Sequence, residues 1–113
     1  MRKNRLLVLS LLLAGLAGWL VEPVLAGNEA TAKAKAQALC QNCHGENGVA
    51  TLPGAANLSG QQKEYLREQL RAFRSGSRQN PQMSVIAKML TDDDIESLSG
   101  WYSSFKISVE TPK

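Results

Sequence analysis

The apolar and polar positions of this chain repeat at helical spacing, and they predict an all-α protein with no β-strand and no internal repeat. Tyr65, Leu66, Leu70 and Phe73 recur at helical spacing on a predicted amphipathic helix. An alanine-rich stretch before them is also predicted to be helical, because alanine is the best helix former. The predicted helices cover about 29–42, about 62–74, 84–90, and 91 to about 106.

Capping residues, glycine and proline predict where these helices begin and end. Asn28 and Thr91 are predicted N-caps, and the three aspartates after Thr91 oppose the positive end of the helix dipole. Gly76 is predicted to end the second helix. The segment 78–83 is predicted to be extended, because Pro81 has no N–H and disfavours a helical conformation in the residue before it.

The N-terminus has the layout of a secretory signal peptide. A short basic stretch precedes an uncharged, almost wholly apolar segment from Leu6 to Val21, and small or aliphatic residues precede Gly27. We therefore predict a signal peptide over 1–26, cleaved after Ala26, and a single domain over 27–113. A retained membrane anchor is the alternative, but the apolar segment is shorter than the roughly 20 residues that a helix needs to span a bilayer.

The charge of the predicted domain bears on its partners. The whole chain has 13 basic and 10 acidic residues and a net charge of +3, and loss of the signal peptide leaves 10 basic and 9 acidic residues. We expect no nucleic-acid partner for a domain so close to neutral. The second helix nevertheless carries a basic stripe, paired in part with Glu64 and Glu68, which is either a solvated face or a docking surface. The stripe comprises Arg67, Arg71, Arg74 and Arg78.

The segment Cys40-Gln41-Asn42-Cys43-His44 contains both cysteines and the only histidine of the chain. Two thiols at this spacing, followed at once by histidine, form the attachment pattern of c-type haem. Each thiol adds to one of the two vinyl groups on one porphyrin edge, and the adjacent imidazole can then ligate the iron. We predict Cys40 and Cys43 as thioether anchors and His44 as the proximal ligand. The glycine-rich segment 45–60 is predicted to form a loop beside them, with Leu52 and Leu58 as its apolar contacts.

Three other uses of the cysteines were weighed. A structural zinc site needs four ligands, and two cysteines with one histidine do not supply them. A thioredoxin-like pair follows a strand, and nothing apolar and β-branched precedes Cys40. A plain disulfide would leave His44 without a role.

A sixth iron ligand is available from one of two methionines, Met83 and Met89. Met89 lies in an apolar run where a methionine is usually core filler. Met83 follows the predicted extended segment, which can lay its sulfur across the open face of the ring, so we predict Met83 as the ligand. If both methionines only pack, the iron is five-coordinate or bound by a lysine such as Lys88.

Taken with these residues, the chain from about 34 to 105 resembles a class I cytochrome c of the small bacterial monohaem type, and also the half-domains of bacterial dihaem cytochromes. Each piece of the resemblance except the first is weak alone, but their order and spacing together are specific. The pieces are Cys-x-x-Cys-His-Gly at 40–45, Asn-Leu-Ser-Gly-Gln at 57–61, Tyr-Leu-Arg-Glu-Gln-Leu at 65–70, Phe-Arg-Ser-Gly at 73–76, Asn-Pro-Gln-Met at 80–83 and Leu-Thr-Asp-Asp-Asp-Ile at 90–95.

The resemblance implies four or five short helices around one covalently bound haem c, with the first and last helices crossing. It implies His44 and Met83 as axial ligands and a periplasmic electron carrier that passes electrons between redox proteins. Two positions depart from the family pattern: Ala56, where relatives often have proline, and Trp101, where they usually have tyrosine in the helix crossing. The apolar spacing of the last helix allows either Trp101 or Tyr102 on its buried face, and we expect Trp101 to pack in the crossing. The first departure leaves open which carbonyl receives the ring N–H of His44.

The resemblance also bears on what the protein does not do. We expect the protein to be a monomer. We also expect that it is not an enzyme and has no small-molecule substrate, because the only histidine is assigned to iron. We expect contact with membranes only through partner complexes. Two alternatives remain open: a haem-bearing subunit of a periplasmic dehydrogenase or oxidase, and a gas-binding haem protein with an open sixth position.

Overall fold

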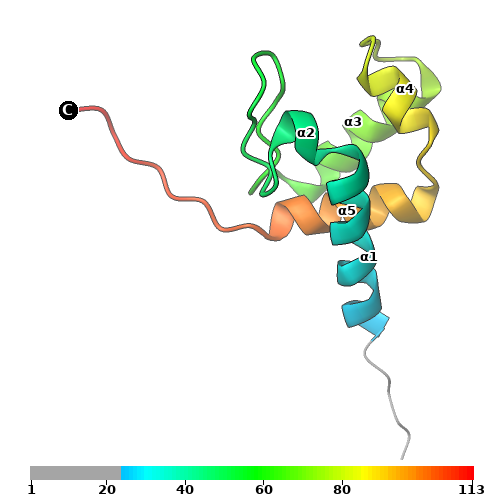
Figure 1. Ribbon diagram of the computed structural model, residues 1–113, viewed down its shortest axis with the longest axis horizontal. Coiled ribbons are helices and arrows are strands. Elements are labelled where there is room, and N and C mark those ends of the chain that lie inside the picture. The colour runs from blue at the N-terminus through cyan, green and yellow to red at the C-terminus, as the bar shows by residue number, and fades with distance from the viewer. Residues whose placement is uncertain (1–23) are drawn as a thin grey trace, which may run out of the picture.

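The computed structural model describes residues 24–113, which form five α-helices and no strand (Figure 1). The predicted signal peptide therefore lies outside the described residues, apart from Val24 to Ala26. No helix in the described part of the chain combines the length and apolar character needed to cross a membrane. The helices are α1 (Val24–Leu39), α2 (Gln41–His44), α3 (Lys63–Ser75), α4 (Met83–Lys88) and α5 (Asp92–Ser104).

The first helix begins earlier than predicted. Asn28 was expected to cap it, but in the full-length chain Asn28 lies inside α1, which starts at Val24. The residues that precede Asn28 include leucine and alanine, which favour helix, so the helix extends back through them. Its end is also earlier: α1 stops at Leu39, and Cys40 forms a turn before α2.

α1 and α5 cross, as the family resemblance implied for the first and last helices (Figure 1). α1 contributes Ala32 and Ala36, which are one turn apart on the same face and only 1 % and 2 % exposed. Ala34 and Ala38, on other faces of the same helix, are exposed. Small side chains at the buried positions allow the backbones of the two helices to approach closely.

The core is built around one face of α5. Ile95, Leu98 and Tyr102 recur at helical spacing and are almost fully buried. They form a cluster with residues of α1 and α3 and with Leu90, which precedes α5. Trp101, predicted for the same face as Tyr102, is only half-buried, and it packs edge-on against Phe105 with ring centroids 5.1 Å apart.

α3 lies at the predicted position, and it packs against both α4 and α5. Leu66 and Phe73 are its buried residues, and Gly76 caps its end in the left-handed conformation, as predicted. Tyr65, expected on the same apolar face, is exposed. The guanidinium of Arg78, just beyond the helix, lies 4.5 Å from the centre of the Phe73 ring and covers its outer side.

The basic stripe of α3 is paired mainly with α5. Arg67 and Lys63 form ion pairs with Glu96, and Arg74 contacts Asp92 at 2.5 Å. The predicted local pairing with Glu64 and Glu68 is therefore wrong for Arg67, because a carboxylate from another helix lies close enough to compete. Two of the four arginines, Arg67 and Arg74, are thus compensated by carboxylates of α5. Arg71 and Arg78 are exposed, and the guanidinium of Arg78 contacts the neutral side chains of Gln69 and Phe73.

Thr91 caps α5 as predicted. Its side chain accepts a hydrogen bond from the N–H of Asp94 at 3.1 Å, and the Asp94 carboxylate accepts from the N–H of Thr91 at 2.9 Å. That backbone N–H, with further help from Lys35, lowers the pKa of Asp94 below its ordinary value. The ammonium of Lys35 lies 3.1 Å from the same carboxylate, and this ion pair joins α1 to the start of α5.

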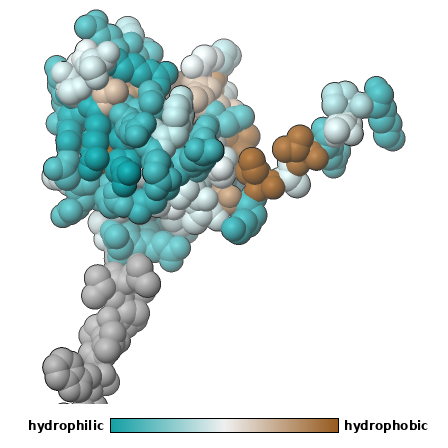
Figure 2. All heavy atoms as spheres, turned by 180° about the vertical axis from the view of Figure 1, so that it is seen from behind, coloured by the Kyte–Doolittle hydropathy of each residue, from teal (hydrophilic) through white to brown (hydrophobic). Residues whose placement is uncertain are grey.

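Beyond α5 the chain runs as an extended tail to Lys113, away from the helices (Figure 1). Figure 2 shows this tail from behind, with its apolar residues Ile107 and Val109 largely exposed. The base of the tail is in contact with the domain, because a Cβ added to Gly60 would lie 3.0 Å from the side chain of Ile107.

The crossing of α1 and α5 can be tested with a larger side chain at one buried alanine. We expect Ala36→Leu to lower the free energy of unfolding of the holoprotein by about 1–3 kcal/mol, because added methylenes force the two helices apart. Ala38→Leu is the matched control on the exposed side of α1 and should change it by less than about 0.5 kcal/mol. Denaturant melts followed by circular dichroism measure both, and equal losses would contradict the close crossing.

Candidate haem site

The Cys-x-x-Cys-His segment forms the turn between α1 and α2 and the whole of α2. The carbonyl oxygen of Cys40 accepts hydrogen bonds from the N–H of Cys43 at 3.3 Å and of His44 at 3.0 Å. One helical turn therefore separates the two thiols and brings them to the same side of the backbone. Both thiols are free and half-buried. Among residues 24–113, no three His, Cys, Asp or Glu side chains gather as a group that could hold a bare metal ion.

The orientation of the His44 ring is fixed by one hydrogen bond. Its Nδ1 lies 2.7 Å from the carbonyl oxygen of Ala56. A carbonyl oxygen can only accept, so Nδ1 carries the proton and donates, and Nε2 of the neutral ring keeps its lone pair. A histidine that ligates a metal has the same arrangement, in which the second ring nitrogen donates to a carbonyl or carboxylate.

This bond answers the question that the departure at Ala56 left open. The acceptor is the carbonyl of Ala56 itself. A backbone carbonyl has the same chemistry whether the residue is alanine or proline, so loss of the family's proline does not remove the acceptor. What the chain must supply is a loop that brings this carbonyl to the ring.

The loop between α2 and α3 is hydrogen-bonded to two helices, α2 and α5. The N–H groups of Thr51 and Leu52 donate to the carbonyl of Cys43 at 3.1 and 3.3 Å, which holds the loop against α2. Farther along, the N–H of Gly60 donates to the carbonyl of Tyr102 in α5 at 2.9 Å. Leu58 packs against the core as predicted, whereas Leu52 is half-exposed and does not. Its side chain stays outside because both N–H bonds to Cys43 hold the backbone at the surface.

Met83 is the first residue of α4 and is half-buried. The prediction of an extended segment here is wrong. The side-chain oxygen of Asn80 accepts hydrogen bonds from the N–H groups of Gln82 and Met83 at 3.0 and 2.9 Å, which turns the chain into the helix. Asparagine followed by Pro81 is a recognised helix-start signal, and it could have revealed this turn.

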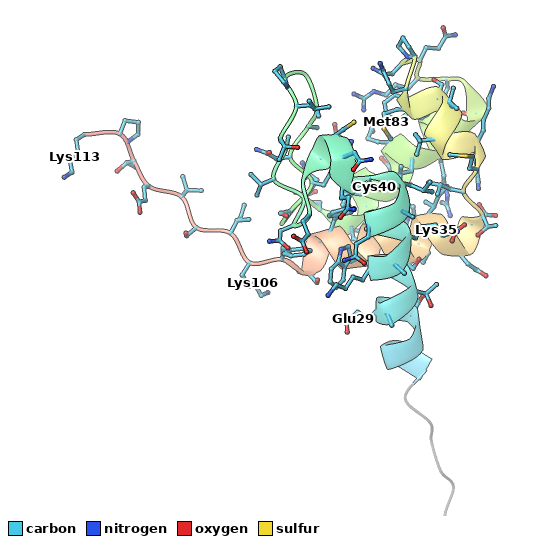
Figure 3. The ribbon with its side chains drawn as sticks, in the orientation of Figure 1. Glu29, Lys35, Cys40, Met83, Lys106 and Lys113 are labelled. Atoms are coloured by element: carbon cyan, nitrogen blue, oxygen red, sulfur yellow. The ribbon has the colours of Figure 1, made fainter. Side chains whose placement is uncertain are left out.

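The other methionine is not core filler. Met89 follows α4 and is 52 % exposed, because the short helix turns its outer face to solvent there. Figure 3 shows Met83 and Cys40 at the same end of the domain, α4 carrying one and the junction of α1 and α2 the other. The local structure therefore gives Met83, but not Met89, a backbone fixed by side-chain hydrogen bonds.

Tyr102 is another residue of this region. The sequence did not decide whether Tyr102 or the adjacent Trp101 is the buried aromatic residue of the last helix. Tyr102 is 3 % exposed, and it belongs to the core cluster against which Cys40 packs. Burial raises the pKa of the Cys40 thiol, and burial also raises the pKa of the Tyr102 hydroxyl. Both groups are therefore protonated at neutral pH.

These residues fit a covalently bound haem. Two free thiols one helical turn apart can each reach a vinyl group of one porphyrin edge, and the next residue presents an imidazole whose Nε2 is available to iron. The hydrogen bond to Ala56 uses Nδ1, so it leaves the lone pair of Nε2, on the other side of the ring, available.

Comparisons with known proteins agree with this site, although no family model matches the chain. Cytochrome c4 of Pseudomonas aeruginosa is 36 % identical over 106 residues, which are 94 % of this chain and 51 % of that protein. Cytochrome c-554(548) of Halomonas halodenitrificans is 37 % identical over 68 residues, 58 % of this chain and 82 % of that protein. The crystal structure of reduced recombinant cytochrome c4 from Pseudomonas stutzeri aligns with a TM-score of 0.63 at 30 % identity, over 72 % of this chain and 50 % of that one.

An all-helical domain whose first and last helices cross, with a Cys-x-x-Cys-His turn after the first, has the cytochrome c fold. The chain belongs to the class I c-type cytochromes. Its cofactor is haem c, which Cys40 and Cys43 stand in the position to attach. The chain spans about half the length of the cytochrome c4 relatives that it matches.

The loop that carries Ala56 to the histidine depends on Gly45. Gly45 has φ 77° and ψ 157°, a conformation open almost only to glycine, and an added Cβ would collide with the carbonyl of Val49. We expect Gly45→Ala to reduce the yield of haem-loaded protein and the free energy of unfolding much more than a control substitution at another glycine does. The control is Gly54→Ala, which shares a positive φ but has open space and should cost about 1–2 kcal/mol. Denaturant melts and haem absorbance per chain measure both, and equal costs would show that contact with Val49 has no effect.

Proposed function

We propose that this protein is a periplasmic electron carrier that holds one haem c by thioether bonds to Cys40 and Cys43, with His44 and Met83 as the axial ligands. Haem c supplies the one-electron chemistry, because its iron passes between the ferric and ferrous states. The observation that carries the proposal is the hydrogen bond from Nδ1 of His44 to the carbonyl of Ala56, which leaves Nε2 as a metal ligand in a fixed orientation.

The chain's own residues would keep both axial side chains still during electron transfer. The ring of His44 is held by Ala56, and the backbone of Met83 is held by the side chain of Asn80. Ligands held in this way need little movement between the two oxidation states, which favours fast electron transfer. Ligation by histidine and methionine also raises the reduction potential.

Exposed apolar side chains follow each proposed axial ligand along the chain. Val49 and Leu52 come after His44, and Val85 and Met89 come after Met83, and all four are at least half-exposed. Exposed apolar residues on functional segments favour docking of a protein partner. This distribution supports brief contact with a redox protein near the haem.

The relatives indicate what kind of partner to expect. A protein named thiosulfate dehydrogenase electron acceptor, from Thiomonas intermedia, is 39 % identical over 72 residues, 63 % of this chain and 33 % of that protein. We infer that this chain likewise accepts electrons from one redox protein and donates them to another, as a monomer and without catalysing a reaction itself. The predicted signal peptide over 1–26 supports export to the periplasm.

A second candidate is a haem-bearing subunit of a periplasmic dehydrogenase or oxidase. The exposed apolar side chains also suit a permanent partner, and co-purification of a stoichiometric enzyme subunit in mild detergent-free buffer would favour this candidate. A single eluted species at the mass of one haem-loaded chain favours the free carrier.

One set of spectra tests the proposed function. We expect the purified protein to carry one haem per chain that survives acid–acetone extraction and to give the pyridine haemochrome spectrum of haem with two thioether bonds. The reduced protein at neutral pH should not bind carbon monoxide, because the sixth position is filled. Extractable haem would contradict covalent attachment, and rapid carbon monoxide binding would favour a gas-binding protein instead.

The sixth ligand can be assigned with the two methionines as a matched pair. We expect Met83→Ala to open ferrous iron to carbon monoxide, lower the reduction potential and remove the sulfur-to-iron charge-transfer band of the ferric protein. Met89→Leu should leave all three nearly unchanged, because Met89 is exposed beyond the end of α4. If the band survives Met83→Ala and disappears in Met89→Leu, the assignment is reversed.

A further inference from the structure

Tyr102 places a polar group in an otherwise apolar part of the core. Its side chain is 3 % exposed, and its hydroxyl oxygen is buried without any hydrogen-bond partner of acceptable geometry among the described residues. The cluster around it consists of Ala36, Leu66, Leu98 and similar apolar side chains. A buried hydroxyl without a partner is unfavourable and requires an explanation.

The position of the Tyr102 ring leaves the hydroxyl little freedom. The backbone carbonyl of Tyr102 is held by the N–H of Gly60, and a Cβ added to Gly48 would lie 2.8 Å from Cδ1 of the ring. The ring is also stacked with Phe105, with centroids 6.5 Å apart. The hydroxyl therefore cannot swing out to solvent without moving the loop between α2 and α3.

The Cys40 thiol is the polar group beside this hydroxyl. Cys40 packs against the cluster that contains Tyr102, and the two side chains affect each other's ionisation, since the Cys40 thiol further raises the pKa of Tyr102 after burial. While the thiol is free either group can act as the donor, and the Tyr102 hydroxyl makes no hydrogen bond of acceptable geometry among the described residues.

We propose that the Tyr102 hydroxyl donates a hydrogen bond to the thioether sulfur at Cys40 in the haem-loaded protein, and that it is a positioning residue for this haem anchor. The proposal rests on the proposed attachment of haem at Cys40. When the thiol adds to a vinyl group, its proton goes to the vinyl carbon and the sulfur keeps only lone pairs. The tyrosine hydroxyl, which remains protonated, is then the only possible donor of the pair.

Such a bond has an electronic consequence. A donor on the thioether sulfur withdraws electron density from the porphyrin edge to which the sulfur is attached. Lower electron density at the ring favours the ferrous state, as hydrogen bonds around a redox centre generally tune its potential. The wild-type protein should therefore have a higher reduction potential than a variant that lacks only this hydroxyl.

Tyr102→Phe removes the hydroxyl and keeps the ring. We expect this variant to fold with a full complement of haem and to have a lower reduction potential than the wild type. Tyr65→Phe, at an exposed tyrosine of α3, is the matched control and should leave the potential unchanged. An unchanged potential in Tyr102→Phe would overturn the proposal.

A double-mutant cycle separates the hydrogen bond from a general packing effect. In a Cys40→Ala background, haem is held through Cys43 alone and the acceptor sulfur is absent. We expect Tyr102→Phe to have no further effect on the potential there, whereas a packing effect would persist in both backgrounds and would contradict the proposal.

Nuclear magnetic resonance of the reduced wild-type protein gives a test that needs no variant to mature. We expect a slowly exchanging hydroxyl proton on Tyr102 with a nuclear Overhauser contact to the thioether bridge at Cys40. A rapidly exchanging hydroxyl, or one without this contact, would overturn the proposal. The haemochrome spectrum distinguishes failure of this proposal from failure of the proposed function. Two thioether bonds with no effect of Tyr102→Phe would refute only the hydrogen bond. A missing thioether bond at Cys40 would refute the attachment of haem at that residue.

Discussion

The structure depends on the fixed orientation of one imidazole. His44 can serve a metal only if one ring nitrogen is free and the ring is held, and the carbonyl of Ala56 meets both conditions with a single hydrogen bond. That carbonyl reaches the ring because the loop after α2 turns at Gly45 and is bonded to Cys43 and to α5. The loop is thus part of the site, although it contributes no side chain to the proposed ligands.

The remaining packing holds this loop and the Cys-x-x-Cys-His turn together. α1 carries the turn at its end and crosses α5 through buried alanines, while the ion pair between Lys35 and Asp94 joins the same two helices. α3 is joined to α5 by Glu96, which pairs with Arg67. Apolar side chains on the segments after the proposed ligands remain open to a partner.

The sequence predicted those features that depend on local chemistry. The attachment turn at Cys40 to His44 follows from residue types at fixed spacing, and α3 and α5 follow from periodic apolar residues and from the Thr91 cap. The helix predicted over 84–90 is present as α4, but the turn before it was missed, because the side chain of Asn80 makes that turn.

Other features depend on contacts between segments that sequence spacing does not reveal. No side-chain signal marks Ala56 as the partner of the histidine, because the acceptor is its backbone. Trp101 and Tyr102 are adjacent aromatics, and only the packing of α5 decides that Tyr102 is buried. Arg67 had a carboxylate within one turn on its own helix, yet it pairs with Glu96 across a helix boundary.

The burial of Cys40 beneath Tyr102 also affects the order of events during biogenesis. The cysteine follows the first described helix and the tyrosine lies on the last one, so the thiol is uncovered until the last helix has packed onto the first. An enzyme that joins haem to this thiol has free access during that interval and much less access afterwards. Folding and cofactor attachment therefore compete in time, and the placement of the covering residue on the last helix gives attachment the earlier opportunity.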